Sequence, residues 1–203
     1  MASQNAAEER RQALILAAGR VFLERGFEAA TTLDIAREAK TSKRAIYEMF
    51  GSKEDLLAAV VSDTSGRMVG PADLPEPRDW PSLAAALTGF GIAFLTQLFE
   101  EQRIAFYRLA VADAQRGGAL ARSIEARGRG PVAEALTQLV TAAVRNGVVL
   151  VVDAGLVADV FISMLFGEMH VRLLIGAVPL PGPEEIAERV EMAVEAVRRV
   201  SGH

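Results

Sequence analysis

The decapeptide TSKRAIYEMF, from Thr41 to Phe50, decides how the first quarter of this sequence folds. At about 100° per residue, a helix through it has two unlike sides. The apolar side consists of Ala45, Ile46, Met49 and Phe50. The polar side consists of Lys43, Arg44, Tyr47 and Glu48. The pattern predicts a short helix that is anchored by one side and presents two cations and a phenol to solvent. Taken alone, such a face is most often only a solvated surface.

Helices are also predicted on both sides of the decapeptide. An apolar repeat predicts a helix over residues 9–25. Thr31, with Asp34 three residues later, has the spacing of a capping box and starts a short second helix. Ser42 is the expected N-cap of the next helix, and a fourth starts at Ser52. A short helix, a tight turn and a second helix make a helix-turn-helix, whose second helix enters the major groove of DNA.

Three runs carry a family pattern across about fifty residues: RQALILAAGRVFLERGF (11–27), TTLDIAREA (31–39) and SKRAIYEMFGSKEDLL (42–57). Together they resemble the N-terminal domain of the tetracycline-repressor (TetR) family of bacterial transcription regulators. The resemblance implies a three-helix DNA-binding domain with a fourth helix as the link. It also implies an all-α C-terminal domain that dimerises and binds a small-molecule inducer.

The resemblance also implies which residues contact DNA. Carried over by position, the family contacts fall on Thr32, Thr41, Ser42, Lys43, Arg44, Tyr47 and Lys53. Most of these are expected to hold phosphates and set the register on the duplex. Lys43 and Arg44 are expected to read base edges, because an ammonium or guanidinium suits the O6 and N7 acceptors of guanine. Lys53 is expected to clamp a phosphate beside the free N–H groups of the following helix.

The chain departs from the family pattern at three positions. Lys40 stands at the turn where the family usually has glycine, and a left-handed residue there costs about 1 kcal/mol. Ala45 and Met49 replace residues that often hydrogen-bond phosphates in the family. These changes put the DNA affinity in question more than the function.

Composition and charge bound the class of protein. Hydrophobic residues make up 51% of the 203 residues and there is no cysteine, so disulfides and thiolate metal sites are excluded. The net charge is −4, but residues 1–53 carry nine Lys/Arg against seven Asp/Glu, a mild basic excess on an acidic body. The polar N-terminus lacks a secretory signal, which indicates the cytoplasm. Ala154–Val178, the most apolar stretch, holds charged residues that a membrane would disfavour.

The chain is expected to be all-α with two domains. A DNA-binding domain, residues 1–53, connects through a helix over 52–68 to a body, residues 69–203. The stretch GPADLPEPRDWP (70–81) holds four of the eight prolines and is expected to be the joint. Helices are predicted over 82–100, 102–115, 119–127, 131–146, 154–175 and 183–200. The strand-like run VVLVV (148–152) has no second strand to pair with and is expected to be an extended connector.

The last two predicted helices carry the expected dimer interface. In the last helix an apolar seam repeats at heptad-like spacing through Ile186, Val190, Ala193 and Val197. Leu156 and Val160 lie on the preceding helix, which is apolar nearly all round. A two-fold four-helix bundle between two copies would bury both helices. Ordinary packing within one chain is the alternative for some of these residues.

Several large side chains in the body are candidates for an effector pocket. They are Phe90, Phe94, Phe106, Tyr107, Phe161, Met164, Glu168 and His170. Aromatic and methionine side chains suit an adaptable apolar cavity, and the ligand expected there is apolar or aromatic and uncharged. The alternative is that the apolar ones are core. Glu168 could equally form an ion pair with Arg172, and His170 could be a satisfied interior histidine.

Nothing in the sequence indicates an enzyme. No catalytic motif, metal-ligand cluster or cofactor fingerprint is recognisable. The predicted function is a regulator that binds an inverted-repeat operator on double-stranded DNA as a homodimer and represses until an effector releases it. The alternative is a helical ligand-binding or scaffolding dimer whose DNA-binding face has weakened, to which Lys40, Ala45 and Met49 would point.

Overall fold

The computed structural model describes residues 2–65, 76–116, 118–150 and 153–202 of the chain. These residues form helices and connecting turns without a β-strand, which confirms the all-α prediction. The strand-like run lies outside regular helix and strand as far as it is described, through Leu150. The chain divides into two compact units. The N-terminal unit comprises residues 1–67 and 105–128, and the C-terminal unit comprises residues 68–104 and 129–203.

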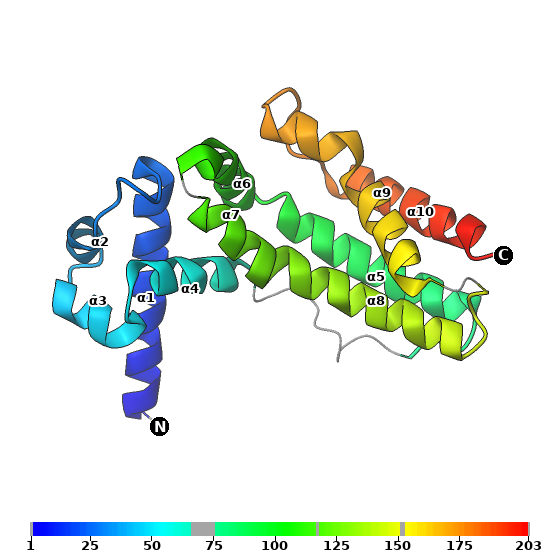
Figure 1. Cartoon of the computed structure of the whole chain (residues 1–203), viewed down its shortest axis with the longest axis horizontal. Coiled ribbons are helices and arrows are strands. Elements are labelled where there is room, and N and C mark those ends of the chain that lie inside the picture. Colours follow the sequence, from blue (N-terminus) through cyan, green and yellow to red (C-terminus); the bar gives the residue numbers. More distant parts are fainter. Residues whose placement is uncertain (1, 66–75, 117, 151–152, 203) are drawn as a thin grey trace. The chain divides into compact units, whose positions relative to one another are not determined.

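The N-terminal unit is built around the first helix (Figure 1). Its helices are α1 (Ala2–Arg25), α2 (Thr32–Glu38), α3 (Lys43–Phe50), α4 (Lys53–Ser65), most of α6 (Glu101–Asp113) and α7 (Ala119–Ile124), with short 3₁₀ and π turns at Ala114–Arg116 and Glu125–Arg129. Helix α1 packs on α2 and α4, and α4 packs on α7. Helix α1 begins seven residues before the predicted start at residue 9, because its first turns are polar and carry no apolar repeat.

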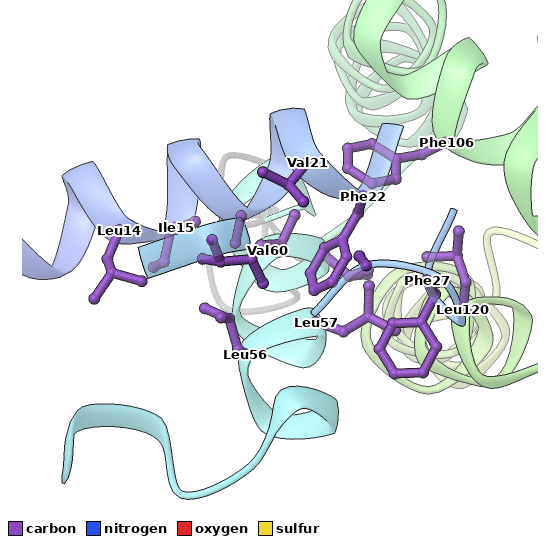
Figure 2. Close-up of a cluster of buried hydrophobic side chains, with 14 of the residues drawn as sticks. Leu14, Ile15, Val21, Phe22, Phe27, Leu56, Leu57, Val60, Phe106 and Leu120 are labelled. Atoms are coloured by element: carbon purple, nitrogen blue, oxygen red, sulfur yellow. The ribbon is translucent and has the colours of Figure 1, made fainter. Parts of the chain in front are cut away.

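The core of the N-terminal unit draws on distant parts of the sequence. Figure 2 shows Leu14 and Phe22 of α1 packed with Leu56 and Leu57 of α4. Buried side chains from α6 and α7, Phe106 and Leu120, belong to the same cluster. Burying apolar surface is worth about 25 cal/mol per Å², so each of these large side chains stabilises the unit. Residues 105–128 thus belong to the N-terminal unit, whereas the sequence predicted a single boundary at residue 69 and placed them in the body.

The C-terminal unit is a bundle of long helices. They are α5 (Trp80–Leu98), α8 (Gly130–Arg145), α9 (Ala154–Leu174) and α10 (Pro183–Val200). Helix α10 packs on α5 and α9, and α9 also packs on α8 (Figure 1). Asp79 caps α5 by accepting a hydrogen bond from the backbone N–H of Ser82 at 2.9 Å. Hydrogen bonds from Ser82, the side chain first, hold the pKa of Asp79 below its ordinary value.

The heptad-like seam of α10 lies inside this bundle. Its members, Ile186, Val190, Ala193 and Val197, are all buried within the chain. A Cβ atom added at Gly91 of α5 would lie 2.9 Å from Cγ1 of Val190, so α5 and α10 approach closely at this point. The sequence predicted this seam at a dimer interface, with packing within one chain as the alternative. The burial of all four residues within the chain favours the alternative, because α5 and α9 already cover the seam.

Helix α9 bends at Gly167. The φ and ψ of Gly167 are 45° and −156°, which is a conformation that only glycine adopts readily. The guanidinium of Arg189 on α10 fills the space beside it, with Nη1 donating to the carbonyl oxygen of Met164 at 3.4 Å. The bend therefore exposes a carbonyl group of α9, and α10 supplies its hydrogen-bond donor.

Two helices of the C-terminal unit, α5 and α9, are long and apolar enough to cross a membrane by length and composition. The sequence predicts no membrane span, and one or two helices of this kind are weak evidence against that prediction. The core helix of a water-soluble protein passes the same test. Asp159, Glu168 and Arg172 lie within α9, and lipid tolerates such charges poorly. Packing on α10 buries part of the apolar surface of both helices.

Candidate nucleic-acid interface

The helix-turn-helix is held by hydrogen bonds at the start of each helix. Thr31 and Asp34 form the predicted capping box of α2, with two backbone-to-side-chain hydrogen bonds of 3.1 Å. Hydrogen bonds from Thr31, and next the charge of Arg25 at 3.1 Å, hold the pKa of the Asp34 carboxyl below its ordinary value. Ser42 caps α3, because its hydroxyl oxygen accepts from the N–H of Ala45 at 3.1 Å. Both predicted caps are confirmed.

The turn between α2 and α3 contains a residue in the left-handed conformation. Lys40 has a φ of 50°, and it is the one non-glycine residue with a positive φ in the described part of the chain. The next residue, Thr41, donates its N–H to the carbonyl of Ala36 at 2.9 Å and closes the turn. The turn thus has the shape that glycine favours, although the chain places a lysine there.

The apolar side of α3 attaches the helix to the core of its unit. Ile46 is fully buried, and Met49 and Phe50 are half-buried against the same cluster. The guanidinium of Arg11 on α1 lies 5.4 Å from the centre of the Phe50 ring. The anchoring predicted for this side of the decapeptide is therefore confirmed.

The opposite side of α3 presents its polar side chains to solvent. The side chain of Arg44 is 86% exposed, and its Nε donates to Oε1 of Glu48 at 2.7 Å. The ammonium of Lys43 lies 5.8 Å from the centre of the Tyr47 ring. Exposed pairs of this kind contribute at most about 1 kcal/mol each, so binding of DNA can displace them at small cost. The polar side chains of α3 therefore pair with one another along the helix and remain accessible to DNA.

The remaining predicted DNA contacts are placed less uniformly. Thr41 is half-buried and Ser42 is exposed at the first turn of α3, beside the cations. Thr32 is only 7% exposed, so α2 offers its first backbone N–H groups more readily than the Thr32 hydroxyl. Lys53 points back into its own unit, where Nζ donates to the carbonyl oxygen of Phe27 at 2.8 Å. The sequence had no signal for this contact, because the two residues are 26 positions apart.

The aromatic candidates for an effector pocket are mostly core. Phe90, Phe94 and Phe161 are buried in the C-terminal unit, with ring centres 5.8 Å apart for Phe90 and Phe94 and 6.5 Å apart for Phe90 and Phe161. Phe106 is buried in the core of the N-terminal unit, and Tyr107 is half-buried on the same helix. For the four phenylalanines, the alternative of ordinary packing fits the structure better.

A cavity of about 330 Å³ lies between the second half of α9 and the start of α10. Its walls include Glu168, Arg172 and Arg189 together with the apolar side chains of Met169 and Pro179. Glu168 and Arg172 form no ion pair in the described structure, so the structural alternative for this pair is not observed. Of the predicted pocket residues, Glu168 lines this cavity.

Two further candidates lie near this part of α9. Met164 is half-buried, and its carbonyl accepts the hydrogen bond from Arg189. The ring of His170 meets the ring of Phe166 edge-on at 4.8 Å, and Phe166 in turn meets Phe94 at 5.8 Å. Burial lowers the pKa of His170. His170 thus belongs to the aromatic packing of the unit, and Phe166 is a member that sequence reasoning missed.

Comparisons with known proteins agree with this architecture. A family model described as bacterial regulatory proteins of the tetR family matches residues 14–60. A model described as the C-terminal domain of AefR-like transcriptional repressors matches residues 85–200. The solved structure of the flavonoid-responsive regulator FrrA is 28% identical, covers 95% of this chain and 96% of that chain, and has a TM-score of 0.76.

Sequence relatives match over about a quarter of the chain. The HTH-type transcriptional regulator HbdR of Aromatoleum sp. (strain CIB) is 52% identical over 50 residues, which is 25% of this chain and 22% of HbdR. The HTH-type transcriptional activator FasR of Mycolicibacterium smegmatis (strain ATCC 700084 / mc(2)155) is 44% identical over 54 residues, 27% of this chain and 25% of FasR. These matches span about a quarter of each relative's length.

A capped helix-turn-helix with an exposed cationic face, joined to an all-helical body, defines the class of DNA-binding transcription regulators. Both parts of the chain match models of one family within that class. The chain belongs to the TetR family of transcriptional regulators, which are non-enzymatic DNA-binding proteins.

Proposed function

We propose that this regulator binds an inverted-repeat operator as a homodimer and represses transcription in the cytoplasm until a small molecule binds its C-terminal unit. The observation that carries the proposal is the polar face of α3. Lys43, Arg44 and Tyr47 are all exposed on a helix whose other side is anchored in the core. A helix anchored on one side, with exposed cationic side chains on the other, meets the requirements of major-groove binding.

The contacts divide into two kinds. Arg44, which carries the exposed guanidinium of α3, is assigned to a base edge, with guanine as the preferred partner, and Lys43 is the second base-reading candidate. Thr41, Ser42 and Tyr47 are assigned to phosphates, which set the position of α3 on the duplex. The first N–H groups of α2, where Thr32 begins the helix, are assigned to another phosphate.

The proposed dimer uses exposed apolar side chains of α9 and α10. Leu156 and Val171 on α9 are 58% and 56% exposed, and Met192 on α10 is 50% exposed. Val160 is half-buried on α9, one turn after Leu156. Large apolar side chains that recur on adjacent helices mark interaction surfaces. Two recognition helices spaced by about 34–36 Å would then meet successive major grooves.

The proposed effector site is the cavity between α9 and α10. A volume of about 330 Å³ is enough for a small organic molecule. Its apolar walls suit an aromatic or aliphatic body, and Arg172, Arg189 and Glu168 suit polar substituents. The structurally similar FrrA is a flavonoid-responsive regulator, and flavonoids are aromatic molecules with polar substituents. This modifies the expectation of a wholly apolar ligand.

Repression, as opposed to activation, is proposed from the family model that matches the C-terminal part of the chain. That model describes repressors, whereas the relative FasR is an activator. A reporter gene placed behind an operator selected from random DNA distinguishes repression from activation. Repression requires lower reporter output when the regulator is present. Higher output would show an activator with the same operator.

The experiment that tests operator binding is selection of duplexes from random DNA by the purified chain at near-physiological salt. Enrichment of one inverted repeat is the expected result. Arg44→Ala should then lose about 1–3 kcal/mol of operator affinity and relax specificity at one base pair of each half-site. Arg127→Ala is the matched control, because Arg127 is an exposed arginine on the π turn and not part of the helix-turn-helix.

Two other outcomes would contradict the proposal. Tight binding without an enriched motif would leave only phosphate electrostatics. No binding by a folded dimer would favour the helical ligand-binding protein with a weakened DNA-binding face.

A further inference from the structure

Lys53 occupies an unusual position for a cation. It is the first residue of α4, where the helix dipole favours negative charge. Its ammonium turns away from the helix end and donates to the carbonyl oxygens of Phe27 at 2.8 Å, Ala30 at 3.1 Å and Glu28 at 3.4 Å. An ammonium has three N–H donors, so this carbonyl cluster occupies all of them.

The Lys53 ammonium also contacts an aromatic ring beside the carbonyl groups. The Lys53 ammonium lies 4.4 Å from the centre of the Phe27 ring, within the range of a cation–π contact. Phe27 is buried and packs on Phe22 of α1 with ring centres 5.6 Å apart. The contact therefore connects the start of α4 to the core of the N-terminal unit.

The three carbonyl groups belong to the segment that joins α1 to α2. This segment is outside regular helix, so its carbonyl groups have no helical partners. Phe27 and Ala30 are both buried, which makes a lost hydrogen bond costly there. The segment ends at Thr31, which caps α2. Lys53 thus fixes the residue that starts the helix-turn-helix.

The first turn of α4 is poorly suited to a phosphate. Glu54 and Asp55 place two carboxylates there. The N–H of Asp55 already donates to the hydroxyl of Ser52 at 2.9 Å. A phosphate at this point would meet like charge and would have to remove Lys53 from its three acceptors.

We propose that Lys53 is a positioning residue that holds the α1–α2 segment, and through it α2 and α3, in the geometry that reads the operator. It is not a phosphate ligand. This inference rests on the proposed operator binding. It assigns to Lys53 an indirect effect on specificity, in place of the direct electrostatic contribution that its position in the sequence pattern predicts.

The test compares Lys53→Met with Lys43→Met in the full-length chain. Binding to the selected operator and to a random duplex is measured by fluorescence anisotropy between about 50 and 300 mM KCl, with the range chosen to resolve a slope of about 0.9 per phosphate contact. Lys53→Met should lower operator affinity about tenfold, leave random-duplex affinity unchanged and leave the salt slope unchanged. Lys43→Met removes a base-reading candidate, so it should lower operator affinity by relaxing the preference at one base pair of each half-site.

Lys53→Arg separates the two roles a second time. A phosphate ligand tolerates arginine, so affinity would be retained. A planar guanidinium cannot converge on the three carbonyls as an ammonium does, so a positioning role predicts the same loss of discrimination as in Lys53→Met. A reduced salt slope in Lys53→Met, or full activity of Lys53→Arg, would overturn the proposal.

Hydrogen exchange tests the contact without DNA. Amide protons of residues 26–31 should exchange faster in Lys53→Met than in the parent chain, with a lower Tm, and those of α8 should not change. Unchanged exchange at 26–31 would overturn the inference. If the parent chain binds no operator while exchange changes as expected, the proposed function fails and the structural contact stands.

Discussion

Lys40 combines a left-handed backbone with a side chain that makes that backbone costly. Its φ of 50° lies where a Cβ atom crowds the following carbonyl, at about 1 kcal/mol. The hydrogen bond from Thr41 to Ala36 closes the turn in spite of this cost. The sequence pattern identified the position because the family usually has glycine there, and the structure retains the shape.

Lys40→Gly should raise the free energy of unfolding by about 1 kcal/mol, because glycine adopts this φ without the steric cost. Urea unfolding followed by circular dichroism measures the change. Lys40→Ala is the control: it removes the charge and keeps the Cβ atom, so stability should stay within about 0.5 kcal/mol of the parent. Equal stabilisation by both variants would assign the effect to charge instead of backbone strain.

At the scale of helices, local signals were reliable and distant ones were not. The caps of α2 and α3 involve partners three residues apart, such as Thr31 with Asp34, so spacing alone could predict them. The partners of Lys53 lie 23 to 26 positions earlier in the chain, and no periodic pattern in the sequence predicts contacts at that separation. The heptad-like spacing predicted an apolar seam on α10, but a sequence does not say which helix covers that seam.

The contact between α5 and α10 gives a prediction for Gly91. A Cβ atom there would lie 2.9 and 3.0 Å from the methyl groups of Val190 and 3.3 Å from Phe161. Overpacking of this kind costs about 1–3 kcal/mol, which exceeds the gain of up to about 1 kcal/mol from replacing glycine in a helix. Gly91→Ala should therefore destabilise the chain, as measured by chemical unfolding.

Gly89, on the same helix, is the matched control for this prediction. A Cβ atom at Gly89 meets no heavy atom within 4 Å, so Gly89→Ala should stabilise by about 0.5–1 kcal/mol. Adding Val190→Ala to Gly91→Ala should recover part of the lost stability if the clash is the cause. An additive double mutant would place the strain elsewhere.

At the scale of the whole molecule, the two units carry different kinds of surface. The N-terminal unit exposes cations on α3, whereas the C-terminal unit exposes large apolar side chains on α9 and α10. Residues 1–53 have a slight basic excess within a chain of net charge −4. In the proposed assembly, the acidic body would confine DNA contact to the recognition helix, and the exposed apolar side chains would contact a second copy.

Leu156→Glu tests this assignment of the dimer surface. Leu156 is 58% exposed in one chain, and a carboxylate buried there in a dimer would be unpaired and costly. The variant should be monomeric by analytical ultracentrifugation at concentrations where the parent chain is a dimer, with an unchanged helical spectrum. Because one recognition helix then meets one half-site, operator binding should weaken by orders of magnitude while binding to an isolated half-site changes little.

The control for this experiment is Val111→Glu, which places the same charge on an exposed apolar residue of α6. Val111 is 67% exposed and belongs to the N-terminal unit, outside the proposed interface. It should leave the dimer and operator binding intact. Equal dissociation by both variants would indicate a nonspecific charge effect, and a dimer that survives Leu156→Glu would move the interface away from the start of α9. The spacing of the two recognition helices depends on which surfaces join the two copies. Either result would therefore remove the argument that a dimer through α9 and α10 sets the spacing of an inverted-repeat operator.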